Sequence, residues 1–135
     1  METAAIILAA GAGTRMKSKK PKVVHEVLGR PLVRWVVEAA KAAGADRIVT
    51  VAGHQREQVI PLVEGDTEVA VQTAQRGTAD AVLAAKDALA GFDGAVVVLS
   101  GDSPLIRPET IRAMCALREE HDAAVVVPTM ELENP

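Results

Sequence analysis

The stretch "AAIILAAGAGTRMKSKKPK", residues 4–22, is the part of the sequence that decides the fold prediction. Its apolar start, Ala4 to Leu8, is typical of a buried strand. The segment that follows has two glycines, one arginine and four lysines, and it shows no apolar periodicity. Connections in α/β units usually take roughly two to six residues, and longer ones are normally functional or disordered. The loop after the first strand is therefore the first place to look for a binding site.

The rest of the chain alternates short β-branched runs with segments of helical periodicity. Strands are predicted at Ala4 to Leu8, Arg47 to Val51, Val69 to Val71, Ala95 to Leu99 and Ala123 to Val127. Helices are predicted from Pro31 to Gly44, weakly from His54 to Val63 with an interruption at Pro61, from Thr78 to about Leu89, and from near Pro108. Uniformly apolar strands between helices predict an α/β fold, a mainly parallel sheet with helices on both faces. Ligands bind such sheets at the carboxyl ends of the strands.

Composition narrows the class of protein further. A chain of 135 residues, 49% hydrophobic and 24% charged, has the composition of one globular domain rather than a disordered chain. A net charge of −3, with Trp35 and Phe92 as its only aromatic residues, argues against a nucleic-acid partner. No apolar run reaches the ~20 residues of a membrane span, and the N-terminus lacks a basic signal region. Cys115 is the one cysteine, so we expect a reducing, cytoplasmic location.

Three phosphate-binding interpretations of the glycine-rich loop are considered. The dinucleotide fingerprint lacks its third glycine, because Met16 stands there, and the P-loop pattern is absent. What remains is a turn whose backbone N–H groups can approach an anion, with Arg15 and Lys22 as cations. On the pattern alone, a solvated basic loop is an equal alternative.

Asp102 follows the predicted strand at Ala95 to Leu99. A carboxylate at the carboxyl end of a strand suits Mg²⁺ that is shared with substrate phosphates, although Gly-Asp-Ser-Pro is also ordinary turn chemistry. The three histidines, His25, His54 and His121, have no metal-ligand spacing and read as surface or packing residues. Trp35 and Cys115 read as packing residues as well.

Three segments together resemble a known family: "LAAGAGTRMKSKKPKVVHEVLGRPL" (8–32), "VQTAQRGTADAV" (71–82) and "VVVLSGDSPLI" (96–106). They are similar to the signature of sugar-nucleotidyltransferases, and most similar to bacterial N-acetylglucosamine-1-phosphate uridyltransferases, the N-terminal half of a bifunctional uridyltransferase and acetyltransferase. The resemblance covers essentially the whole chain. It implies a Rossmann-like nucleotidyltransferase (GT-A-like) fold that is incomplete at its C-terminus, with residues 1–135 as its nucleotide-binding part.

The resemblance also implies roles for individual residues. Arg15 and Lys22 would be the catalytic cations, and Asp102 would be the Mg²⁺ ligand. Gln72, Gly77 and Thr78 would read the base and ribose, although from the sequence alone Thr78 is only a helix N-cap. The remaining implied nucleotide-binding residues are Leu8, Ala9, Ala10, Gly11, Gly13, Ser100 and Gly101. Asp80 stands where the family commonly has a histidine, and we interpret it as a tolerated variation that is favourable in a first helical turn.

The implied reaction is attack of N-acetylglucosamine-1-phosphate on UTP, which gives UDP-N-acetylglucosamine for cell-wall synthesis and pyrophosphate. Another nucleotidyltransferase with a different base or acceptor, and a nucleotide-binding module without turnover, remain alternatives. The implied partners are UTP and a sugar-1-phosphate, without nucleic acid or membrane. The resemblance also implies that full-length members of the family form homotrimers through a C-terminal domain. The tail from Pro128 to Pro135 carries no stop signal, so we expect the chain to continue and the sugar-binding residues and a second metal ligand to come later.

Overall fold

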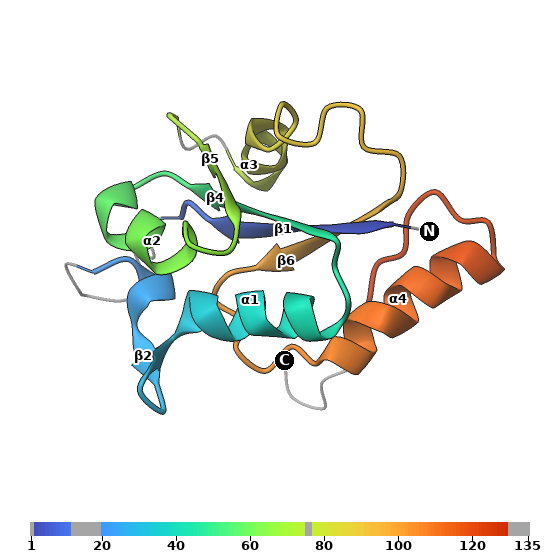
Figure 1. Ribbon diagram of the computed structural model, residues 1–135, viewed down its shortest axis with the longest axis horizontal. Helices are drawn as coiled ribbons and strands as arrows, with labels where there is room; N and C mark the ends of the chain where they lie inside the picture. The colour runs from blue at the N-terminus through green and yellow to red at the C-terminus, as the bar shows by residue number, and fades with distance from the viewer. Residues whose placement is uncertain (1, 12–19, 75–76, 130–135) are drawn as a thin grey trace.

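A computed structural model of the protein describes residues 2–11, 20–74 and 77–129 (Figure 1). Within this part of the chain, four strands form one sheet in the order β5-β4-β1-β6. All three pairings are parallel. The strands are β1 (Thr3–Ala9), β4 (Arg47–Ala52), β5 (Glu68–Val71) and β6 (Ala95–Ser100). The predicted mainly parallel sheet is therefore confirmed.

The first face of the sheet carries the larger core. It is covered by α1 (Leu32–Ala42), α2 (Arg56–Val63) and α4 (Pro108–Glu120). Val33, Val36 and Val37 of α1 are fully buried against Ala5 and Ile7 of β1. Burying one such aliphatic side chain contributes roughly 1.5–3 kcal/mol, so α1 is held mainly by this apolar stripe.

The second face is covered less completely, by α3 (Thr78–Ala84) alone among the described helices. Figure 1 shows α3 on one side of the sheet and α1 with α4 on the other. Ala81 packs with Ile6 and Val49, over the centre of the sheet. Val96 and Val98 of β6 belong to the same face but are 46% and 44% exposed. The prediction of helices on both faces is confirmed. β6, although its run is uniformly apolar, alternates between buried and exposed residues because it lies at the edge of the sheet, beyond the reach of α3.

The predictions for two helices are also corrected. α2 runs through Pro61 without interruption. A proline costs a helix about 3 kcal/mol, but Val59 and Val63 of α2 are fully buried and hold it against the sheet. α3 ends at Ala84 rather than near Leu89, and Gly77, with φ of 103°, is its N-cap in place of the predicted Thr78.

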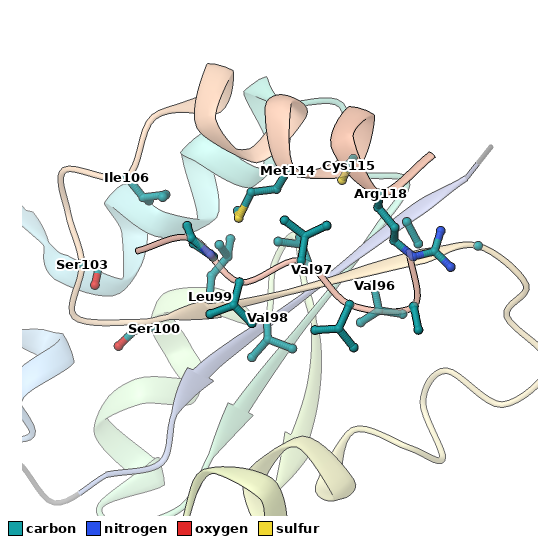
Figure 2. A pocket seen from close by; sticks show the side chains of 17 residues that line it. Val96, Val97, Val98, Leu99, Ser100, Ser103, Ile106, Met114, Cys115 and Arg118 are labelled. Atoms are coloured by element: carbon teal, nitrogen blue, oxygen red, sulfur yellow. The ribbon is translucent and has the colours of Figure 1, made fainter. Parts of the chain in front are cut away.

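The predicted strand at Ala123 to Val127 is absent from the structure. Residues 123–129 follow α4 as irregular chain, and Val125 and Val127 are each 73% exposed. Val125 and Val127 line a groove of about 710 Å³ along the edge of β6 (Figure 2). Met114, Cys115 and Arg118 of α4 line the same groove. A β-branched run forms a strand only when its backbone is hydrogen-bonded to a neighbouring strand. Within the described residues, residues 123–127 pair with no strand.

A short hairpin that the sequence did not predict lies between the glycine-rich loop and α1. After a 3₁₀ turn, η1 (Lys22–Val24), it is formed by β2 (Glu26–Val27) and β3 (Arg30–Pro31), with Leu28 and Gly29 at positive φ in its turn. Trp35 donates from Nε1 to the carbonyl oxygens of Val27 and Arg30, at 3.1 and 3.2 Å. The Arg30 guanidinium lies 4.5 Å from the Trp35 ring centroid. Trp35 therefore anchors the hairpin to α1.

Across the described residues, no helix combines the length and apolar composition needed to span a membrane.

Candidate functional site

A cavity of about 400 Å³ opens at the carboxyl end of the sheet, where ligands of parallel sheets bind. Its lining comes from segments that are far apart in the sequence: Leu8, Ala10, Gly11, Lys22, Val23, Gln72, Gly77, Thr78, Ala81, Ser100 and Asp102. The structure thus brings together nine of the residues singled out in the sequence, whereas Val23 and Ala81 were not predicted. Of the other predicted residues, Gly13 and Arg15 lie outside the described residues.

The two remaining predicted residues, Ala9 and Gly101, are buried beside the cavity rather than lining it. Side chains alternate along a strand, so Leu8 and Ala10 lie at the cavity while the side chain of Ala9 belongs to the core under α1. Ala9 can therefore offer a ligand only its backbone.

Gly101 permits a close approach between the turn after β6 and the end of β1. Its N–H donates to the Leu8 carbonyl oxygen at 2.9 Å. A Cβ atom at this position would lie 2.7 Å from that oxygen and 3.2 Å from Cγ1 of Val23. Only glycine fits without displacement of the backbone, and this contact places the neighbouring Asp102 at the rim of the cavity.

Asp102 is the acidic side chain of the cavity lining, and it is held from two sides. Ser100 donates from Oγ to Oδ1 at 2.5 Å, and Nζ of Lys22 lies 3.0 Å from Oδ2. The Ser100 hydrogen bond, followed by the hydrogen bond and charge of Lys22, lowers the pKa of Asp102 despite its partial burial. The carboxylate is therefore ionised at neutral pH. Sequence reasoning missed this ion pair because its two members lie in separate segments.

The residues present fit a divalent cation bound together with a phosphate ligand. The described residues contain no cluster of three or more His, Cys, Asp or Glu side chains that could hold a metal by themselves. Mg²⁺, however, commonly takes one or two carboxylates and completes its shell with water and substrate phosphates. A single ionised Asp102 at the rim of an open cavity provides such a ligand, and the cation would compete with Lys22 for it.

Gln72 continues the line of β5 into the cavity and is 7% exposed. Its backbone N–H donates to the Ala52 carbonyl oxygen at 2.8 Å. Its side-chain Nε2 donates to Oδ2 of Asp80 at 3.2 Å and makes a longer contact of 3.5 Å with the Gly77 carbonyl oxygen. The sequence patterns assigned no role in the site to Asp80. A usable signal existed, since a polar residue at a strand end was followed by an acid in the first turn of the next helix.

The histidines do not gather at the cavity. His25 lies between η1 and β2, His54 follows β4, and His121 follows α4. None of the three lines the cavity, which agrees with their interpretation as surface or packing residues.

Comparison with known proteins defines the class to which this fold and cavity belong. Residues 5–134 match the MobA-like NTP transferase domain, and the chain belongs to this family. Family membership confirms the nucleotidyltransferase class that the three motifs predicted.

Particular relatives are close over this region. Across 98% of its length the chain is 53% identical to the Bifunctional protein GlmU of Anaeromyxobacter sp. (strain K), of which it covers 28%. The chain spans less than a third of the length of such relatives.

Solved structures share the fold. A nucleotidyl transferase from a Methanothermobacter species, Mth528, superposes with a TM-score of 0.76 at 23% identity, over 85% of this chain and 57% of that chain. Rv0371c from Mycobacterium tuberculosis H37Rv, solved in complex with manganese, gives 0.67 at 22% identity, over 87% of this chain and 59% of that chain. These likenesses confirm the nucleotidyltransferase-like fold.

Proposed function

We propose that the chain is the nucleotide-binding part of a uridylyltransferase that transfers UMP from UTP to N-acetylglucosamine-1-phosphate, a step in cell-wall precursor synthesis. The observation that carries the proposal is the meeting of Gly11, Lys22, Gln72 and Asp102 in one cavity at the carboxyl end of a parallel sheet. The 53% identity to a Bifunctional protein GlmU supports the choice of reaction.

The reaction needs no protein nucleophile. An oxygen of the sugar phosphate attacks the α-phosphorus of UTP, and the bond from this phosphorus to the α–β bridging oxygen breaks. Pyrophosphate leaves with the electron pair of that bond. The protein's part is to hold the two reactants in line and to neutralise the charge that develops on the phosphate oxygens.

Among the described residues that line the cavity, Lys22 supplies positive charge. Its side chain is 44% exposed and its ammonium reaches the cavity through the ion pair with Asp102. When a triphosphate enters, Nζ of Lys22 can exchange the carboxylate for phosphate oxygens. Arg15 acts in the same way in this proposal, which rests on its position in the motif since it lies outside the described residues.

Asp102 would hold Mg²⁺, which neutralises phosphate oxygens and polarises the phosphorus when it is bound. The ionised state of the carboxylate and its place at the rim of the cavity support this role. The manganese complex of Rv0371c, a protein with the same fold, supports a divalent cation in general.

The base would lie against Gln72, Gly77 and Thr78. A planar side-chain amide offers one donor group and one acceptor in a fixed plane, which suits the edge of a pyrimidine. Gly77 and Thr78 line the same cavity as Gln72, and both are exposed. The backbone of residues 8–11 would frame the ribose and phosphates.

A pyrophosphate-release assay with the full-length protein tests the proposal. The four ribonucleoside triphosphates are each combined with N-acetylglucosamine-1-phosphate and with other hexose-1-phosphates in the presence of Mg²⁺. We expect release with UTP and the N-acetylated sugar. Release with another pair would identify a different nucleotidyltransferase, and binding of UTP without release by any pair would identify a nucleotide-binding module.

A further inference from the structure

The contact between Gln72 and Asp80 fixes which end of the Gln72 amide points to a ligand. Both groups near Nε2, the Asp80 carboxylate and the Gly77 carbonyl, hold acceptor oxygens at 3.2 and 3.5 Å. The oxygens of a carboxylate and of a carbonyl are hydrogen-bond acceptors. The amide must therefore present its NH₂ group to them, and Oε1 is the end that remains for a ligand in the cavity.

The surroundings hold Gln72 in this orientation. Its residue is 7% exposed, and its backbone is fixed by the 2.8 Å hydrogen bond to Ala52. Turning the amide over would bring Oε1 against the Asp80 carboxylate and would lose a charge-assisted hydrogen bond. The bond to Asp80 also polarises the amide, which makes Oε1 a stronger acceptor.

An acceptor at this position discriminates between pyrimidines. Uracil carries a hydrogen on ring nitrogen N3 and can donate it to Oε1, whereas N3 of cytosine is itself an acceptor. Two acceptors facing each other in a mostly buried site leave both unpaired and disfavour the complex.

We propose that Asp80 is a positioning residue for base selection, which holds Gln72 so that Oε1 accepts N3–H of a uracil ring and rejects cytosine. The inference rests on the proposed function, since it takes the cavity to be the nucleotide site. It gives Asp80, which does not itself line the cavity, a role that acts entirely through Gln72.

The test measures dissociation constants of UTP and CTP, with Mg²⁺, for the full-length protein and for Asp80→Ala, Gln72→Ala and the double variant. We expect the wild type to bind UTP more tightly than CTP. We expect Asp80→Ala to lower this preference by about tenfold, since a charge-assisted hydrogen bond is lost. In turnover, KM for UTP rises while kcat stays within about twofold.

The double variant separates a positioning role from a general effect on the fold. If Asp80 acts through Gln72, adding Asp80→Ala to Gln72→Ala changes the UTP preference no further. Asp80→Asn keeps an acceptor oxygen without the charge and is expected to retain an intermediate preference. Asp87→Asn is the matched control, because it removes the same charge from an exposed turn after α3 that does not line the cavity.

An Asp80→Ala variant that keeps the wild-type UTP preference overturns this inference alone, and so do effects of the two alanine variants that simply add. A wild-type protein that binds no uridine nucleotide overturns the proposed function and this inference with it. Thermal unfolding of each variant, measured in parallel, shows that losses in preference are not losses of folded protein.

Discussion

At the scale of single residues, the proposed mechanism gives Lys22 a role in neutralising phosphate charge, while its contacts contribute little to the stability of the fold. Its side chain is 44% exposed, and it pairs with a carboxylate that is 33% exposed. Ion pairs of this kind contribute only about 0–1 kcal/mol to stability. A preorganised cation at a phosphoryl centre is worth about 3 kcal/mol in the transition state, or roughly a hundredfold in rate.

We therefore expect Lys22→Ala to lower kcat/KM for UTP by roughly a hundredfold while the free energy of unfolding falls by less than about 1 kcal/mol. Steady-state kinetics and denaturant unfolding of the full-length protein measure the two quantities. Arg15→Ala is expected to behave in the same way. Wild-type turnover in either variant would remove that residue from the proposed mechanism.

Asp102→Asn is expected to weaken Mg²⁺-dependent nucleotide binding and to leave the fold intact. The amide keeps the size of the side chain but loses the charge that a hard cation requires. Calorimetric titration of UTP with and without Mg²⁺ measures the change. Asp93→Asn is the control, since this exposed acid lies before β6, at the opposite end of the sheet. An unchanged metal dependence in Asp102→Asn would return Asp102 to the role of a turn residue.

Gly101→Ala is expected to damage the site by sterics alone. The added Cβ atom would lie 2.7 Å from the Leu8 carbonyl oxygen, so the turn that carries Asp102 must move away from β1. Overpacking of this kind typically costs about 1–3 kcal/mol, and UTP affinity should fall with it. Gly65→Ala, where a Cβ meets nothing within 4 Å, is the matched control. Unfolding midpoints that match for the two variants would contradict the steric explanation.

At the scale of elements, ion pairs fix α1 to the connection between α2 and β5. Nη1 and Nη2 of Arg34 donate to the two oxygens of Asp66 at 2.7 and 2.9 Å, and Nζ of Lys41 donates to Oδ2 at 3.1 Å. Arg34 also pairs with Glu38 one turn along α1. Hydrogen bonds from Arg34, then those from Lys41, lower the pKa of Asp66 to about 2.

This network predicts a pH dependence of stability. A carboxyl group with a lowered pKa stabilises the fold fully above its unfolded pKa, near 3.8, and loses that contribution as the pH falls toward about 2. The side chain is 30% exposed, so after screening by solvent the contribution is on the order of 1 kcal/mol. We expect Asp66→Asn to be less stable than the wild type at pH 7 and equal to it near pH 2. Denaturant unfolding across this range measures both curves, and curves that stay parallel would contradict the assignment.

The strands also show which parts of the fold can be predicted from sequence patterns. β1 and β4 were predicted to within two residues, because their apolar runs are buried on both faces and the pattern reports that burial directly. β6 has the same kind of sequence but alternates between buried and exposed residues. Its exposure depends on where α3 lies, which no local pattern records. Residues 123–127 have strand propensity yet lack a paired neighbour in the described structure, and pairing is a tertiary property.

In the candidate site, too, some features could be predicted from the sequence and others depend on tertiary structure. The resemblance predicted which residues bind the nucleotide, and nine of those residues line the cavity at the carboxyl end of the sheet. It did not predict how they pair. The contacts of Lys22 with Asp102 and of Gln72 with Asp80 depend on the relative placement of separate segments, and so does the burial of Ala9 on the opposite face.

At the scale of the whole molecule, the two faces of the sheet are unequally covered. Among the described residues, three helices pack on the first face, while α3 covers only the centre of the second. Val96 and Val98 of β6, an edge strand of the described sheet, are left exposed and line the apolar groove of Figure 2. An unpaired edge with exposed apolar side chains is a template for pairing with another chain.

We therefore expect the 135-residue polypeptide, expressed alone, to self-associate with rising concentration through β6. A variant with Val96→Thr and Val98→Lys should lower the association, because threonine preserves strand propensity while an edge lysine opposes pairing between sheets. Sedimentation velocity over a concentration series measures the effect. Leu28→Asn is the control, since Leu28 is 89% exposed at the tip of the β2–β3 hairpin and its φ of 53° suits asparagine. Association that the β6 variant leaves unchanged, or that the Leu28 variant abolishes, would place the contact elsewhere.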